Sequence, residues 1–409
     1  MNSPAREAGA AQAPPRYDNV ILLGAGASAD AGIPMLDSFV DKMWEYAIRG
    51  KVGDKPLIEA DKELLTEANK IRIELDHYSS RAFFDSRNLE DILSLLSFEA
   101  LDDEKRAKYD TMVRAVARTI ELSCIYPYTG PTSVVPGRSG DYGGFWRSLF
   151  HQQVQAALPA LITFNYDLVF ERSLWESFNF EDLENRGKSR SVRLKYYYGM
   201  YDCPINGVPQ RYSTRDGVIA GQRGDFDWHH KPEIQLPYLK LHGSLNWDRN
   251  IFSEPFDRHG CPVIPSGHPT QAVEHPLILP PVFNKTDSPK INSVWKAALS
   301  ILRHAKNIVI VGYSLPKTDI YMQYFLKSAV GPNSDLQKII VFDPVLFRGD
   351  EKTAQMKQRY KECFSPQFSG RIIFEPAGHV YQSSNSPWGT FRHFTETLRT
   401  SPNYLLFYP

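Results

Sequence analysis

The sequence predicts an α/β protein with a Rossmann-like, mostly parallel sheet and a large helical insertion. Short apolar runs of the kind that form buried parallel strands recur along the chain. Segments whose apolar residues follow helical spacing separate these runs, and the first run leads directly into a glycine-rich turn. Alternating strands and helices favour a parallel sheet with right-handed crossovers.

The composition is that of a globular protein with balanced charge. Among 409 residues, Lys+Arg and Asp+Glu both number 47, so the formal net charge is zero. This balance argues against a surface built mainly to bind phosphate backbones, and we expect no direct nucleic-acid binding. We expect no membrane association, because the sequence has no apolar run of about 18 residues. Four scattered cysteines and no apolar leader indicate a cytoplasmic protein.

The first half of the chain predicts one strand followed by a helical region. Residues 1–17 are polar and rich in Ala and Pro, so a disordered tail is expected. The apolar run at 19–23 predicts a buried strand, and the spacing at 36–48 predicts a helix. Helical patterns continue over 58–124. Glycine and proline residues at 126–144 then predict a loop.

The second half of the chain returns to alternating strands and helices. Strands are predicted at 160–163, 194–198, 238–241, 307–311, 338–342 and 372–374. Helices are predicted at 168–175, 291–304, 320–329 and 390–398. The predicted parts are a tail (1–17), a Rossmann-like core (18–48 and 158–345), a helical insertion with its loop (49–157), a polar insertion within the core (180–235), and a C-terminal strand-and-helix extension (346–409).

The glycine-rich turn is the first candidate site. Gly24 and Gly26 close a predicted strand and open a helix, so backbone N–H groups and the positive helix end would face a pyrophosphate. A tight strand-to-helix turn without a ligand is the structural alternative. A dinucleotide dehydrogenase would carry an acidic residue at the end of a second strand about 20 residues later. That position falls within a predicted helix here, which weakens the dehydrogenase interpretation.

Polar residues follow four other predicted strands. Asn165 and Asp167 follow one, and His242, Ser314 and Asp343 follow the others. Ligands of open α/β sheets bind beyond the carboxyl ends of the strands, where these residues would converge. Each also has a structural explanation, because a polar residue before a helix can cap it and a lone histidine is often a structural hydrogen-bonding group. Their joint placement favours a functional site.

Four motifs, in the same order, resemble those of the sirtuin-like family. They are GAGASADAGIP at 24–34, TFNYD at 163–167, LHGSLNW at 241–247 and GYSLPKTD at 312–319. The resemblance spans about residues 18–345. It is closer to the bacterial branch of the family, which consumes NAD⁺ in anti-phage defence, than to the protein deacylases. It implies an NAD-binding core.

The resemblance also implies roles for the matching residues. Gly24, Ala25, Gly26, Ser28 and Ala29 would line the pyrophosphate loop, and Ile33 and Pro34 would border the nicotinamide pocket. Asn165 and Asp167 match residues near the nicotinamide ribose, and His242 matches the catalytic histidine; these three are the predicted catalytic residues. Ser314 falls on the ribose–phosphate side, and Asp343 falls near the residue that reads the adenosine ribose.

Two departures separate the sequence from the deacylases. Deacylases carry a zinc ribbon with two CxxC pairs after the His-Gly motif, whereas only Cys261 lies in that region here, so we expect no zinc. Met35 and Leu36 stand where deacylases usually place an aromatic residue and Arg, so the nicotinamide-handling role of those deacylase residues is not carried over to these two positions.

The leading hypothesis is an NAD⁺ glycohydrolase that releases nicotinamide and ADP-ribose and acts in anti-phage defence by depleting NAD⁺, its substrate. Regulation by assembly suggests a homo-oligomer, and the resemblance implies a protein partner such as a HerA-like ATPase. One alternative is a zinc-free protein deacylase or ADP-ribosyltransferase. Another is a non-catalytic subunit that binds NAD or ADP-ribose within a defence complex.

Overall fold

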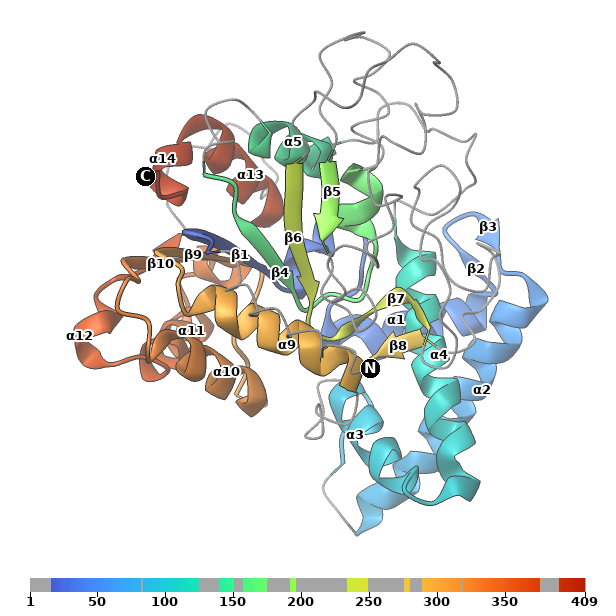
Figure 1. Ribbon diagram of the computed structural model, residues 1–409. Coiled ribbons are helices and arrows are strands. Elements are labelled where there is room, and N and C mark those ends of the chain that lie inside the picture. The colour runs from blue at the N-terminus through green and yellow to red at the C-terminus, as the bar shows by residue number, and fades with distance from the viewer. Residues whose placement is uncertain are drawn as a thin grey trace, which may run out of the picture.

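A computed structural model gives the architecture of the chain (Figure 1). It describes residues 16–81, 84–124, 140–150, 157–174, 192–195, 234–248, 276–279, 289–317, 319–375 and 390–408. The predicted loop at 126–139, most of the polar insertion at 180–235 and nearly all of the predicted tail lie outside these residues. None of the described helices is both long and apolar enough to cross a bilayer.

A seven-stranded sheet forms the centre of the molecule, and every pair of neighbouring strands in it is parallel. Its strand order is β11-β10-β9-β1-β4-β6-β5. The strands are β1 (Asn19–Leu23), β4 (Ala160–Thr163), β5 (Val192–Lys195), β6 (Ile234–Lys240), β9 (Asn307–Val311), β10 (Lys338–Phe342) and β11 (Ile372–Glu375). The predicted α/β class with a parallel, Rossmann-like sheet is confirmed.

The central strands are apolar because both faces of the sheet are covered. Every residue of β1, β4 and β9 is buried, as expected for a parallel sheet between helical layers. On one face lie α9 (Pro289–Leu302), α10 (Ile320–Val330) and α11 (Glu351–Glu362), and on the other lie α5 (Gly140–Leu149) and α13 (Thr390–Thr400) (Figure 1). From β1 the sheet is extended toward β4 and β6, and from β9 it is extended the opposite way toward β10 and β11. The order of the strands therefore reverses between β1 and β9.

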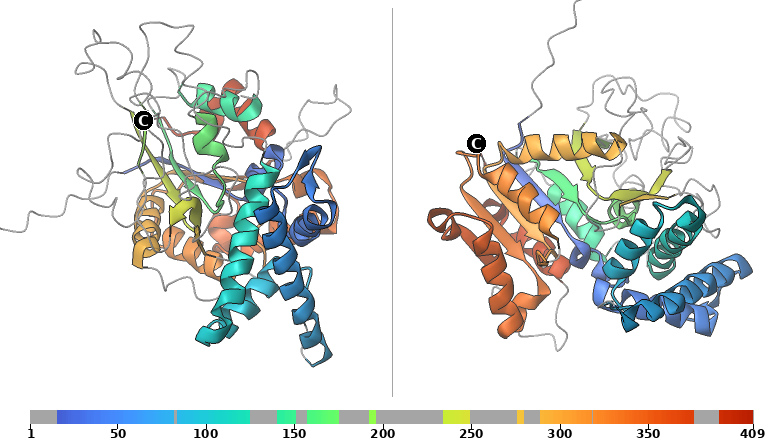
Figure 2. Two further views of the ribbon diagram at one scale, coloured as in Figure 1. Left: turned by 90° about the vertical axis from the view of Figure 1, so that its right-hand side faces the viewer. Right: turned by 90° about the horizontal axis from the view of Figure 1, so that it is seen from below.

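The helical insertion forms a separate group beside the sheet (Figure 2). It contains α2 (Glu59–Leu75), α3 (Leu89–Glu99) and α4 (Arg106–Ser123), with α2 and α3 packed on α4, and α1 (Leu36–Arg49) joins it to the core. A small hairpin of β2 (Lys51–Val52) and β3 (Lys55–Pro56) precedes α2. Arg118 of α4 forms a buried, bidentate ion pair with Asp61 of α2, with N–O distances of 2.6 and 2.8 Å.

The loop predicted at 126–144 is wrong for its last five residues, which belong to α5. The glycines there predict a loop from local propensity, but Tyr142, Phe145, Trp146 and Leu149 lie on one helical face and are all buried. Tyr142 stacks on Phe391 of α13 with ring centroids 4.7 Å apart. Tertiary packing of this aromatic face outweighs the weak helix propensity of glycine.

Candidate active site

The candidate residues lie at the carboxyl edge of the sheet, around the point where strand order reverses between β1 and β9. Open α/β sheets bind their ligands at this edge, where the strand order reverses. The turn after β1 consists of two short 3-10 helices, η1 (Ala25–Ala27) and η2 (Ala29–Ala31), rather than the start of an α-helix. α1 begins only at Leu36.

The glycines of this turn allow the backbone after β1 to contact the backbone after β9. A Cβ on Gly24 would lie 2.5 Å from the carbonyl oxygen of Gly312, and a Cβ on Gly312 would lie 2.3 Å from the nitrogen of Ala27. Gly312 also has a φ of +67°. The turns after β1 and β9 therefore touch directly, and only glycine permits this approach.

The N–H groups of the turn differ from the expectation for a pyrophosphate-binding helix start. Those of Gly24 and Gly26 donate to the carbonyls of Val311 and Gly312, each at 2.9 Å. Those of Ala27 and Ser28 donate to carbonyls within the turn itself. These four donors hold the fold together, and Ala25 is the exposed residue at the tip of the first 3-10 turn.

Asn165 connects the turn after β4 to the turn after β1. Its side-chain amide donates to the carbonyl of Gly24 and to the hydroxyl of Ser28, each at 2.9 Å. Its own N–H donates to Thr163 Oγ1 at 3.0 Å. Asn165 thus fixes the glycine turn and does not cap the following helix, so the structural alternative of a simple cap is wrong for this residue.

Asp167 caps that following helix and belongs to the same network. Its Oδ1 accepts the N–H of Val169 at 3.0 Å, and its carboxyl is hydrogen-bonded to Ser28. Burial raises the pKa of Asp167, and the nearby Lys240 ammonium, the Ser28 hydroxyl and the Val169 N–H all oppose this rise. Ser28, which is fully buried, therefore joins Asn165 to Asp167.

His242 follows β6 and lies among aromatic rings. Its ring centroid is 5.6 Å from that of Phe164, 6.2 Å from that of Tyr166 and 6.1 Å from that of Trp295. Gly243 follows it with a φ of +87° and begins β7 (Gly243–Asp248), which pairs antiparallel with β8 (Pro276–Ile278). The histidine is 5% exposed and adjoins the turn that carries Asn165 and Asp167.

The segment after β9 is held in an unusual conformation by α11. Leu315 is buried with a φ of +50°, a left-handed conformation that costs energy in a residue with a side chain. Arg359 stabilises it by donating to the carbonyls of Leu315 at 2.8 Å and Ser314 at 3.1 Å. Tyr360 donates to the carbonyl of Tyr313. Strain held in this way at a sheet's carboxyl edge is typical of ligand-binding segments.

Asp343 ends β10 next to the glycine contact. Gly312 donates its N–H to the carbonyl of Phe342 at 2.7 Å, and the Asp343 side chain accepts the N–H of Val345 at 2.9 Å. Burial raises the pKa of Asp343 to about 6, against the Val345 N–H and the Arg359 guanidinium, which lower it. The Asp343 carboxyl therefore changes its charge slightly below neutral pH.

The structure brings the predicted residues together to different degrees. Direct contacts join Gly24, Ser28, Asn165 and Asp167, as given above. Ile33 and Pro34 lie between η2 and α1, and Ala29 is half-buried in η2. These placements leave the roles implied by the motifs as predictions.

Sequence reasoning missed three charged residues that support the site. Lys240 and Glu171 form a buried ion pair beneath Asp167, and Arg359 holds the segment after β9. A charged residue inside the apolar run at 238–241 was a usable signal for Lys240, because an unpaired charge is not buried there. Nothing in the local sequence marks Arg359, whose partners are more than 40 positions away.

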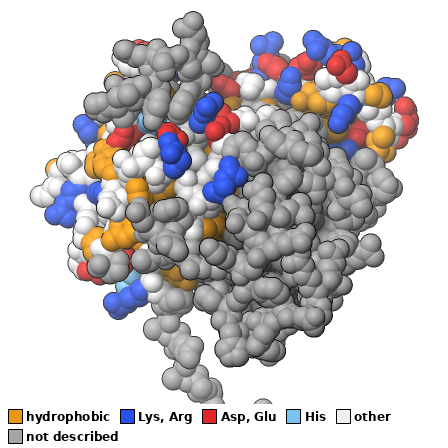
Figure 3. All heavy atoms as spheres, turned by 90° about the horizontal axis from the view of Figure 1, so that it is seen from above, with side chains coloured by type: hydrophobic (Ala, Val, Ile, Leu, Met, Phe, Trp, Pro, Cys, Tyr) orange, Lys and Arg blue, Asp and Glu red, His pale blue; other side chains and the backbone are white. Residues whose placement is uncertain are grey.

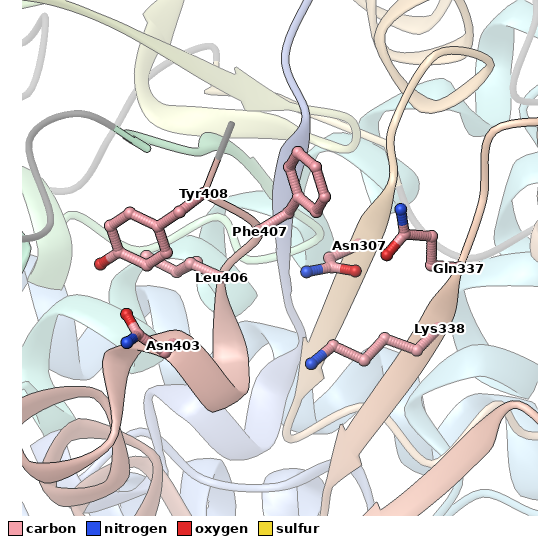
Figure 4. Close-up of a pocket in the computed structure, with 7 residues that line it drawn as sticks. All are labelled: Asn307, Gln337, Lys338, Asn403, Leu406, Phe407 and Tyr408. Carbon is pink, nitrogen blue, oxygen red and sulfur yellow. The ribbon is translucent and has the colours of Figure 1, made fainter.

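Three other features of the described residues bear on ligands. They contain no cluster of three or more metal-ligating side chains, and Cys261 and its neighbouring histidines lie outside them. A cavity of about 540 Å³ lies at the opposite, amino edge of the sheet, where Asn307 and Lys338 face the C-terminal segment with Tyr408 (Figure 4). Charged side chains of both signs intermix on the described part of the surface in Figure 3.

Comparisons with known proteins find similar structures at low similarity. No family model matches the chain, and no curated protein does. A mutant Sir2 homologue in complex with ADP-ribose shares 13% identity at a TM-score of 0.33, covering 84% of this chain and 91% of its own. A Sir2 protein bound to a propionylated peptide shares 10% identity at a TM-score of 0.29, covering 80% of each chain.

Proposed function

We propose that this protein is an NAD⁺ glycohydrolase that releases nicotinamide and ADP-ribose. The observation that carries the proposal is the buried network of Ser28, Asn165 and Asp167 beside His242, at the strand reversal of a parallel sheet. These residues belong to three of the four motifs that resemble the sirtuin-like family.

Hydrolysis of NAD⁺ needs few protein groups, and we assign their roles to residues of this site. Cleavage of the N-glycosidic bond passes through an oxocarbenium-like state, and the pyridinium leaving group needs no acid to depart. The Asp167 carboxylate would stabilise the developing positive charge, and Asn165 would fix the turn that faces the ribose. His242, an imidazole among aromatic rings, would accept a proton from water or a ribose hydroxyl. The pyrophosphate would lie over the exposed Ala25.

The wider role follows from the motif resemblance. Depletion of NAD⁺ during phage infection, a cytoplasmic location, a homo-oligomeric state and control by a HerA-like ATPase all belong to this proposal. An enzyme that destroys its host's cofactor must be held inactive, so assembly with a partner is the expected form of control.

The test is NAD⁺ turnover by the purified chain, alone and with any co-purifying protein. We expect release of nicotinamide and ADP-ribose without an acyl-peptide, and a loss of about 10²-fold or more in His242→Ala. Leu279→Ala is the control, because the backbone N–H of Leu279 donates to the carbonyl of His242 and the substitution keeps this bond. Release that requires an acyl-peptide or acceptor would instead favour a deacylase or ADP-ribosyltransferase. Binding of ADP-ribose without turnover in any state would favour a binding subunit.

A further inference from the structure

A fully buried ion pair lies beneath the candidate site, where β6 faces the helix at 169–174. The Nζ of Lys240 lies 2.8 Å from Oε1 of Glu171, and both side chains are 0% exposed. Tyr238, two residues earlier on the same face of β6, donates its hydroxyl to the other carboxylate oxygen of Glu171 at 3.3 Å. The pair therefore has partners for both carboxylate oxygens.

The same ammonium holds the turn that carries the candidate residues. Lys240 Nζ donates to the carbonyl of Asp167, and it lies 3.4 Å from the carbonyl of Tyr166. With the bond to Glu171, these contacts use the three donors of an ammonium group. His242 lies two residues further along the chain. One side chain thus connects the strand that leads to His242 with the turn that contains Asn165 and Asp167.

Both positive and negative side chains of this cluster lie near the Asp167 carboxyl. Lys240 favours the ionised form of Asp167, and so does Arg172, whose guanidinium pairs with Glu121 at 2.8 and 3.0 Å. Glu171, one helical turn away, repels a second negative charge. Ser28 and the N–H of Val169 complete the surroundings as hydrogen-bond donors.

We propose that Lys240 is a positioning residue of the site, which holds the 165–167 turn against β6 and places a positive charge near Asp167. Glu171 pairs directly with the buried ammonium, and the Asp167 carboxyl is a second negative group near it. A purely structural ion pair would need only the bond between Lys240 and Glu171. The ammonium also bonds to two carbonyls of the 165–167 turn, and these bonds fix the turn that carries the candidate residues. The part of the proposal that concerns turnover rests on the proposed function.

Paired variants separate positioning from folding. Lys240→Met alone leaves two buried carboxylates without their cation, which is strongly destabilising. Glu171→Gln keeps an oxygen acceptor for Lys240 and leaves both carbonyl contacts in place. The double variant Lys240→Met/Glu171→Gln removes both charges at similar volume, so we expect it to fold, and it lacks the contacts to the turn. Comparing the double variant with Glu171→Gln isolates Lys240.

The decisive readout is the titration of Asp167, followed by ¹³C NMR of carboxyl-labelled aspartate and assigned with Asp167→Asn. We expect the pKa of Asp167 to be lower in Glu171→Gln than in the wild type, and higher in the double variant than in Glu171→Gln. Equal titration in these two variants would overturn the proposal. This measurement needs no turnover, so it stands even if the proposed function fails.

Turnover gives the second readout if the wild type hydrolyses NAD⁺. We expect kcat of the double variant to fall at least about 10-fold below that of Glu171→Gln, with KM changed less, because misplacing reacting groups acts on the chemical step. The acid limb of the pH profile should also move to higher pH. Equal kcat values and pH profiles in the two folded variants would contradict a positioning role. Failure of the wild type itself would count against the proposed function alone.

Discussion

Replacing Asp343 by Asn should stabilise the free protein at neutral pH. Asp343 is 3% exposed, and its carboxyl caps the 3-10 helix η8 (Pro344–Phe347) through the N–H of Val345. Asn accepts the same hydrogen bond as well as Asp does, and it carries no charge to bury. The substitution therefore keeps the cap and removes the cost of a buried carboxylate.

The magnitude follows from the pKa of Asp343. A rise from 3.8 to about 6 corresponds to at most about 3 kcal/mol. Between these two values the folded protein holds a proton that the unfolded chain has lost, so the free energy of unfolding falls as pH rises through this window. The loss is complete above about pH 7. Relative to wild type, Asp343→Asn should gain nothing near pH 4 and about 1–3 kcal/mol at pH 8.

Urea unfolding of both proteins at a series of pH values measures this difference. The control is Asp350→Asn at the exposed N-cap of α11, where Asp350 accepts the N–H of Thr353 at 3.1 Å. That variant should leave the midpoint nearly unchanged at every pH. A midpoint of Asp343→Asn at pH 8 no higher than that of the wild type would refute the reasoning. If Asp343 also binds a ribose, the same variant should bind ADP-ribose more weakly despite its greater stability.

Two further substitutions test contacts on which the fold depends. Gly312→Ala should lower the free energy of unfolding by about 3 kcal/mol, because the new Cβ would lie 2.3 Å from the nitrogen of Ala27 at a positive φ. The control is Gly370→Ala, whose Cβ has nothing within 4 Å. Equal urea midpoints for the two variants would contradict the contact. Arg118→Met should cost about 3–5 kcal/mol by leaving Asp61 buried without its cation, and adding Asp61→Leu should recover most of it. A single variant as stable as the double one would show that the pair contributes little.

The central strands could be predicted from the sequence because buried parallel strands are short runs of apolar residues. The runs at 19–23, 160–163, 307–311 and 338–342 are mostly apolar segments with at most one polar residue at an end, and each forms a strand with the predicted bounds. The helix at 140–149 was missed because its stability comes from α13, which follows 240 positions later in the chain. Local glycine content indicated a loop, and no local pattern reports a distant packing partner.

The candidate site was predictable as a set of positions but not as a set of contacts. Strand ends identified Asn165, Asp167 and Asp343, since a parallel sheet brings carboxyl ends to one edge. The partners that hold these residues, such as Arg359 in α11, come from elements far away in sequence. The glycine turn shows the same limit, because the strand-end pattern does not report the neighbouring backbone for which its glycines make room.

Site and fold share their contacts here, so loss of activity alone is weak support for any catalytic role. Asn165 donates to the carbonyl of Gly24 and to Ser28, and Asn165→Ala would remove both buried hydrogen bonds at a cost of about 1 kcal/mol each. Such a variant loses turnover whether or not Asn165 faces the substrate. Asp343→Asn avoids this ambiguity, because stability and ligand affinity should change in opposite directions. A site residue of this protein is best established by a variant that gains stability while it loses binding, since a merely structural role predicts that both change together.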